Sequence, residues 1–130
     1  MNIAVRYYSR SGHTKAVADA IAKAAGVSAI SVDAAGAAIS EPADVLFIGG
    51  ALYAYGLDKH LKAYLKTLKA GDAKKAVIFS TSMISKHSID LIREGLEAAG
   101  IPVEAEYFYA KSKPTAQQLA EAELFAKKFI

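Results

Sequence analysis

Three hydroxyl side chains and a glycine are concentrated in one six-residue segment, Ser9-Arg10-Ser11-Gly12-His13-Thr14. A helical pattern follows it, so its backbone N–H groups belong to the start of a helix, where they lack intrahelical partners. The helix start also carries a partial positive charge, and glycine permits a tight backbone curl that points N–H groups inward. Such a segment binds anions, usually phosphate. The alternative is an ordinary strand-to-helix turn with a serine or threonine cap.

The residues at the ends of the first and third predicted strands exclude three other classes of nucleotide- or phosphate-binding protein. It contains neither the G-x-G-x-x-G of dinucleotide-binding proteins nor the G-x-x-x-x-G-K-[ST] of P-loop proteins. A phospho-accepting receiver domain needs an acidic residue after the third strand and an acidic pair after the first. This chain has Ile48-Gly49-Gly50 and Tyr7-Tyr8-Ser9 at those places.

Two further loops contain side chains suited to a flat ligand. The first is Gly50-Ala51-Leu52-Tyr53-Ala54-Tyr55-Gly56, whose tyrosines could offer aromatic surface to a ring. The second is Ser80-Thr81-Ser82-Met83-Ile84-Ser85-Lys86, in which the soft side chain of Met83 could lie against a ring. The alternative is that Tyr53, Tyr55 and Met83 only pack within their loops.

The rest of the chain lacks the patterns of other reactive sites. It has no cysteine, which excludes a disulfide framework, a thiolate zinc site and a thiol nucleophile. His13, His60 and His87 do not have metal-ligand spacing. No carboxylate pair or Ser/His/Asp set is evident. We therefore expect no catalytic side chain and no metal ligand.

Strand and helix patterns alternate along the whole chain and position these loops. Apolar, β-rich runs predict strands over 3–8, 29–32, 44–48, 76–79 and 103–110. Helical spacing predicts helices over 15–25, around the leucine stripe 57–68, over 89–96, and from a capping box at Thr115 and Gln118 to about 129. The alanine-rich segment 33–43 predicts a short or irregular helix. Gly26 and Gly100 mark helix ends.

Strands joined through helices are parallel, with right-handed crossovers. The predicted architecture is therefore an α/β three-layer sandwich, doubly wound, in a single domain spanning residues 1–130. Ligands of such sheets bind outside the carboxyl ends of the strands, where strand order reverses. The three loops described above lie at those ends.

The motif Ser9-x-Ser11-Gly12-His13-Thr14 resembles the FMN-phosphate loop of flavodoxins, [ST]-x-[ST]-G-[NH]-T. The resemblance implies a flavodoxin-like sheet with strand order 2-1-3-4-5 and FMN as cofactor. It also implies that the hydroxyls of Ser9, Ser11 and Thr14 and the amides from Arg10 to Thr14, Gly12 included, hold the phosphate. His13 contributes mainly its backbone.

The spacing G-A-x-x-x-Y-G resembles the second loop of flavodoxin-fold quinone oxidoreductases and flavodoxin-like protoporphyrinogen oxidases. It implies that Tyr55 lines the isoalloxazine and that Gly56 lies beside the N5 edge. The third loop resembles one whose amides contact the pyrimidine edge, but it lacks the aromatic and acidic residues of electron carriers. The implied ring contacts are Ala51, Leu52, Tyr53, Ala54, Tyr55, Gly56, Thr81, Ser82 and Met83.

Two functions follow from this resemblance. The first is an electron carrier that moves electrons between a reductase and an acceptor protein. The alternative is an FMN-dependent oxidoreductase acting on quinones or protoporphyrinogen, which the Tyr55-Gly56 spacing favours. The lack of a long insertion disfavours protoporphyrinogen. A third reading is a module that kept the fold without the cofactor.

The charge pattern bears on partners. The net charge is +3, and six lysines fall between Ala51 and Lys75. Lys62, Lys66 and Lys69 are expected on one outward helix face, either solvated or docking an acidic partner. No basic stripe with interleaved aromatics indicates nucleic-acid binding. Since no signal peptide or membrane-spanning run is evident, we expect a cytoplasmic location. We also expect a monomer or weak dimer.

Overall fold

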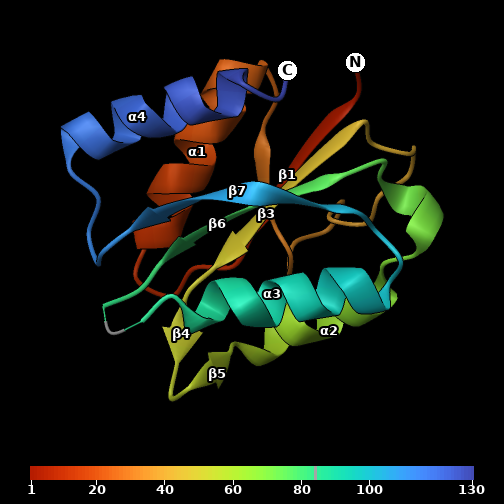
Figure 1. Cartoon of the computed structure of the whole chain (residues 1–130), viewed down its shortest axis with the longest axis horizontal. Coiled ribbons are helices and arrows are strands. Elements are labelled where there is room, and N and C mark those ends of the chain that lie inside the picture. Colours follow the sequence, from red (N-terminus) through yellow and green to blue (C-terminus); the bar gives the residue numbers. More distant parts are fainter. Residues whose placement is uncertain (84) are drawn as a thin grey trace.

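A computed structural model describes residues 1–83 and 85–130, and it contains a five-stranded parallel sheet (Figure 1). The strand order is β2-β1-β3-β6-β7, which confirms the predicted order 2-1-3-4-5 under different labels. The strands are β1 (Ile3–Tyr7), β2 (Ala29–Ser31), β3 (Val45–Gly50), β6 (Ala76–Thr81) and β7 (Val103–Ala110).

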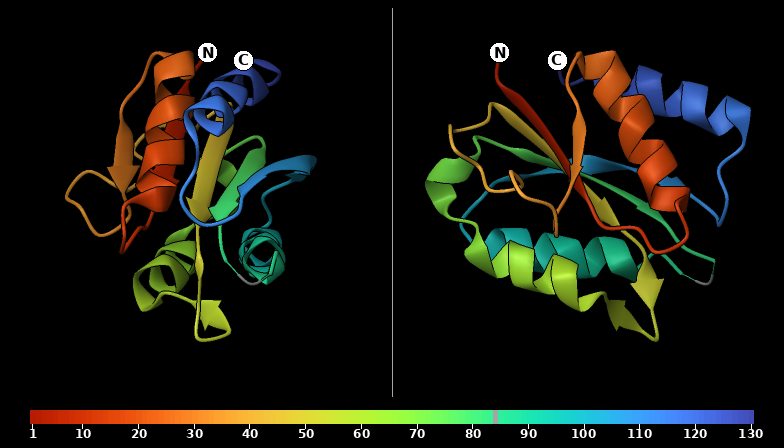
Figure 2. Two further views of the ribbon diagram at one scale, coloured as in Figure 1. Left: turned by 90° about the vertical axis from the view of Figure 1, so that its left-hand side faces the viewer. Right: turned by 180° about the vertical axis from the view of Figure 1, so that it is seen from behind.

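Two helices cover each face of the sheet (Figures 1 and 2). One layer holds α1 (His13–Ala25) and α4 (Ala116–Lys127), and the other holds α2 (Lys59–Thr67) and α3 (His87–Ala98). The predicted helix ends are confirmed. Gly26 ends α1 in the left-handed conformation, and Thr115 and Gln118 form the capping box of α4. The three-layer α/β sandwich therefore forms as the sequence pattern predicts.

The central strands β3 and β6 are buried along their whole length because helices cover both of their faces. Phe47 and Phe79 are 0% exposed and belong to the core beneath α1 and α4. Ile48 and Ile78 point the other way, into the core beneath α2 and α3. Continuous apolar runs are what a strand covered on both faces requires.

The predicted helix over 33–43 is wrong, because this segment forms turns. Gly36 has φ 88°, outside the range of a right-handed helix. Other residues satisfy the backbone instead: the buried Arg6 donates Nε–H to the carbonyl of Ala37 at 2.7 Å, and the hydroxyl of Tyr64 donates to the same oxygen. Side-chain donors thus satisfy a backbone carbonyl for which a helix would have supplied a backbone donor.

A small hairpin, which the sequence pattern did not predict, follows β3. Its strands are β4 (Leu52–Tyr53) and β5 (Gly56–Leu57), paired antiparallel. The two turn residues, Ala54 and Tyr55, have φ 46° and 68°. Positive φ at both central residues is the geometry of a type I′ hairpin turn.

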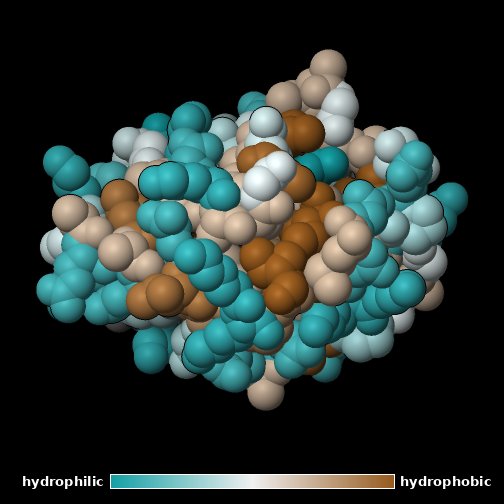
Figure 3. Space-filling view, turned by 90° about the horizontal axis from the view of Figure 1, so that it is seen from above, coloured by the Kyte–Doolittle hydropathy of each residue, from teal (hydrophilic) through white to brown (hydrophobic). Residues whose placement is uncertain are grey.

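No helix among residues 1–83 and 85–130 is long and apolar enough to cross a membrane. Figure 3 shows the face over α1 and α4, where hydrophobic side chains gather near the middle among hydrophilic ones. A short 3₁₀ turn, η1 (Ala70–Asp72), lies between α2 and β6 in the chain.

Candidate functional site

A cavity of about 260 Å³ lies at the carboxyl ends of β1, β3 and β6. It brings together eight of the fifteen predicted site residues, drawn from all three loops. Ser112, which follows β7, also lines it and was not predicted. The lining residues are Ser11, His13, Ala51, Leu52, Tyr53, Thr81, Ser82, Met83 and Ser112.

The first loop has the backbone of an anion site. Gly12 precedes α1 with φ 91°, and no side chain caps the helix. Because a Cβ at Gly12 would meet nothing within 4 Å, its backbone conformation, and not lack of space, favours glycine there. The Oγ of Ser9 accepts the N–H of Gly12 at 2.9 Å and holds the curl. The first turn of α1 contains no acidic residue, so the partial positive charge of its start faces the cavity unopposed.

Thr14 ties the first loop to the third. Its hydroxyl lies 2.7 Å from the hydroxyl of Thr81, and both side chains are buried. A hydroxyl donates one hydrogen bond and can accept two. If Thr81 donates in this pair, the proton of Thr14 stays free for a ligand. The resemblance implied only that Thr14 binds the phosphate, and the structure shows that its hydroxyl also bonds to that of Thr81.

The second and third loops are also joined below the cavity. The Oγ of Ser80 donates to the carbonyl of Gly50 and lies 2.6 Å from the Oγ of Ser88. A Cβ at Gly49 would lie 2.3 Å from Cδ2 of Phe79, and one at Gly50 would lie 2.5 Å from Cδ2 of Leu61. Both glycines therefore serve close packing at the end of β3, where the loop turns toward the cavity.

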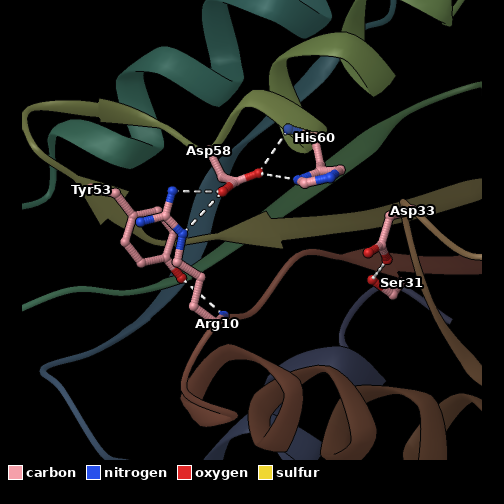
Figure 4. Close-up of polar contacts among 6 residues, drawn as sticks. All are labelled: Arg10, Ser31, Asp33, Tyr53, Asp58 and His60. Atoms are coloured by element: carbon pink, nitrogen blue, oxygen red, sulfur yellow. Dashed lines mark hydrogen bonds and ion pairs between the residues drawn. The ribbon is translucent and has the colours of Figure 1, made fainter.

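The side chain of Arg10 binds the second loop (Figure 4). Its Nε and Nη2 donate to Oδ2 of Asp58 at 3.0 and 2.7 Å. Its guanidinium carbon lies 4.0 Å from the centre of the Tyr53 ring, and its backbone N–H donates to the Tyr53 hydroxyl at 3.2 Å. Arg10 thus fixes the ring of Tyr53 at the edge of the cavity.

Asp58 anchors the cluster that it forms with Arg10, Tyr53 and His60, and it was not among the predicted site residues. It is 4% exposed and caps α2, accepting from the backbone N–H of His60 at 2.7 Å and contacting its Nδ1 at 2.8 Å. Burial alone would raise the pKa of Asp58, but hydrogen bonds from His60 and Arg10 outweigh it and hold the pKa below its ordinary value. An aspartate just before a helical pattern is a capping signal, and that signal could have identified it.

The cluster continues through stacked rings to the end of β1. The ring of His60 stacks on that of Tyr8, with centres 4.7 Å apart and planes 13° apart. Burial and the nearby carboxylate of Asp58 raise the pKa of Tyr8. These contacts hold the starts of α2 and of the first loop in one arrangement.

The remaining predicted residues lie away from the cavity walls. Tyr55 is 85% exposed at the hairpin tip. Ala54 shares that tip, and Gly56 lies in β5 with φ outside the left-handed region. Ser9, Arg10, Gly12 and Thr14 belong to the first loop and its helix start without lining the cavity.

The third loop contributes Thr81, Ser82 and Met83 to the lining. The hydroxyl of Tyr109, on β7, donates to the carbonyl of Ser82 and fixes that backbone. Met83 is 68% exposed, so the cavity is open on this side. Residue 84, also in this predicted loop, lies outside the described residues. The described residues contain no group of three His, Asp or Glu side chains placed to hold a metal ion.

Comparisons with solved structures agree with this fold. Flavodoxin 1 from Bacillus cereus superimposes with a TM-score of 0.82 at 20% identity, over 99% of this chain and 97% of that one. A flavodoxin from the domain Archaea gives 0.77 at 25% identity, over 99% and 96%. Rubredoxin oxygen:oxidoreductase from Desulfovibrio gigas gives 0.85 at 19% identity, over 98% of this chain but 34% of that one.

No curated protein matches the sequence significantly. A family model described as "Flavodoxin domain" matches residues 4–126. The match covers the phosphate-loop motif, the five strands and the loops around the cavity. The chain therefore belongs to the flavodoxin family.

Proposed function

We propose that this chain binds FMN in the cavity and works as an electron-transfer protein. Flavodoxins typically bind this flavin and transfer electrons with redox partners, which supports the proposal in general terms. The single observation that carries it for this chain is the meeting of the Ser9–Thr14 loop, at the start of α1, with a cavity lined by all three loops.

The residues present fit the phosphate of FMN. The nine residues that line the cavity contribute hydroxyls and backbone amides and no carboxylate. Ser11 would offer its hydroxyl, and the first amides of α1 would face the same anion. Asp58, which holds Arg10 beside Tyr53, is engaged by Arg10 and His60 and so presents little free negative charge to the cavity.

The residues also fit a flat ring. Tyr53 is the tyrosine that lines the cavity, and Arg10 holds one side of its ring. We therefore assign the ring-stacking role to Tyr53, whereas Tyr55 projects from the hairpin tip. When bound, FMN supplies one- or two-electron redox chemistry, and the protein sets its orientation and potential.

Titration of the purified protein with FMN and riboflavin tests the proposal. We expect one FMN per chain, with flavin absorbance shifted and fluorescence quenched, and weaker binding of riboflavin, which lacks the phosphate. No binding of FMN at micromolar concentration would refute the proposal.

One observation favours the oxidoreductase as a second candidate. Met83 leaves the cavity open on the side of the third loop, where a substrate could reach a ring. Turnover of a nicotinamide donor with a quinone would favour this candidate. Reduction by dithionite in two resolved spectroscopic steps, without such turnover, would favour the carrier.

A further inference from the structure

A second hollow lies on the other side of the hairpin, between α2 and α3. Its volume is about 440 Å³, larger than that of the cavity assigned to the flavin. Residues from β5, α2, α3 and the segments that follow the two helices line it. They are Leu57, Lys62, Leu65, Lys66, Leu68, Leu91, Gly95, Ala98 and Ala99.

The hollow exists because α3 presents small residues to α2. Gly95 approaches Leu65 so closely that a Cβ there would lie 2.9 Å from its Cδ1. Ala98 and Ala99 continue the small surface toward the end of α3. Leucines of α2 and β5 form the floor, so the groove is apolar along its base.

The α2 rim of the groove carries positive charge, and one acidic residue lies beside the α3 rim. Lys62 and Lys66 stand one helical turn apart on the α2 rim, and both are exposed. Neither has a carboxylate within 4.0 Å among the residues the structure describes. Glu94 lies on the α3 rim by helical phase, one turn from Leu91 and Ala98. Lys69, predicted on the same face as Lys62 and Lys66, lines a different cavity.

We propose that this groove docks an acidic amphipathic helix of a partner protein. Its apolar residues would lie on the leucine floor, and its carboxylates would face Lys62 and Lys66. The flank facing Glu94 would be neutral or basic. Two ammonium groups with no carboxylate partner among the described residues lie over an apolar floor, and their charge complementarity identifies this occupant, since helix-in-groove recognition combines apolar anchors with flanking charges.

The groove also reaches the proposed flavin site. Leu57 of β5 lines it, and the Nζ of Lys62 lies 3.6 Å from where a Cβ at Gly56 would stand. A helix seated in the groove would thus bring its protein beside the hairpin that carries Tyr53. The inference that this partner exchanges electrons rests on the proposed function, whereas docking itself does not require flavin.

Fluorescence anisotropy with a labelled helical peptide of about 14 residues tests the docking. The peptide carries leucines on one face, glutamates on one flank and glutamines elsewhere. Two comparison peptides replace the glutamates with lysines or the leucines with serines. Amide chemical shifts of ¹⁵N-labelled protein locate the bound peptide, and each measurement is made with and without FMN.

We expect the glutamate peptide to bind and to shift amides of α2 and α3, and both comparison peptides to bind far more weakly. Lys62→Glu and Lys66→Glu should each weaken binding roughly fivefold at low salt, with less effect at high salt. Lys127→Glu, on α4 in the opposite layer, is the charge-matched control and should leave affinity within about twofold.

Equal binding by the three peptides, or equal affinity of Lys66→Glu and Lys127→Glu, would overturn the proposal. So would amide shifts confined to the α1 and α4 face. Lysine-dependent binding to vesicles with anionic lipid, without binding of the glutamate peptide, would assign the face to a membrane surface instead. Failure of FMN to bind would leave the peptide result readable, because the groove is tested without flavin as well.

Discussion

Removal of the Thr14 hydroxyl alone should destabilise the protein more than removal of both hydroxyls in the Thr14–Thr81 pair. The two oxygens lie 2.7 Å apart, and the side chains are 1% and 3% exposed. Valine has nearly the shape of threonine, so Thr14→Val leaves the hydroxyl of Thr81 buried without this partner. An unsatisfied buried hydroxyl costs about 1–3 kcal/mol, whereas replacing both partners is nearly neutral.

The expected change is large enough to measure. With an unfolding entropy of about 2.1 cal/mol/K per residue, each kcal/mol lowers Tm by roughly 4 °C in a chain of 130 residues. Thr14→Val and Thr81→Val should each lower Tm by roughly 4–11 °C, and the double variant should lower it by less than either single variant does. Urea unfolding of the four proteins, without flavin, gives the coupling energy directly.

An additive result would show that the two hydroxyls are not partners, and it would remove the physical link between the first and third loops. Titration with FMN separates the second role of Thr14. If Thr81 donates within the pair, Thr14→Val should weaken FMN more than Thr81→Val does. Equal weakening would refute that assignment of the proton.

Three further predictions address the cluster and the cavity. Because the pKa of Asp58 is lowered in the folded state, its ionised carboxylate stabilises the fold above its unfolded pKa of about 3.9, and this stabilisation is lost as pH falls through the folded pKa. The urea midpoint of Asp58→Asn should therefore change less with pH in the acid range than that of the wild type. Ser11→Ala should weaken FMN by roughly 1.5–3 kcal/mol and leave riboflavin almost unchanged in the same fluorescence titration. Tyr53→Leu should restore the fluorescence of bound FMN and Tyr55→Leu should not, which quenching at saturation measures; restoration by Tyr55→Leu alone would return the stacking role to the hairpin tip.

The sheet could be predicted because its signals are local. The apolar runs that became β3 and β6 and the capping residues of α1 and α4 each act within a few positions of the chain. The turns over 33–43 could not be predicted, because Arg6 and Tyr64 stabilise them from distant positions. An alanine-rich segment favours a helix only where no tertiary contact outweighs that preference.

The candidate site likewise depends partly on local signals and partly on contacts between distant positions. The Ser9–Thr14 motif indicates the proposed anion loop directly in the sequence, because its residues would act through their own backbone and hydroxyls. The choice between Tyr53 and Tyr55 depends on which one Arg10 and Asp58 hold, and those contacts join residues 43 and 48 positions apart. The resemblance implied Tyr55 for the ring, and nothing in the sequence indicates the hairpin turn at Ala54 and Tyr55 that favours Tyr53 in our proposal.

That hairpin turn has a thermodynamic consequence. Alanine and tyrosine in the left-handed region each carry a cost of roughly 1 kcal/mol that glycine would not. A second backbone arrangement of the turn therefore needs only a small free-energy advantage to become populated, and a ligand that contacts the hairpin can supply it. Ala54→Gly should remove part of that cost and so favour the arrangement seen here, which means that a single methyl group can change how readily the loop beside the cavity rearranges.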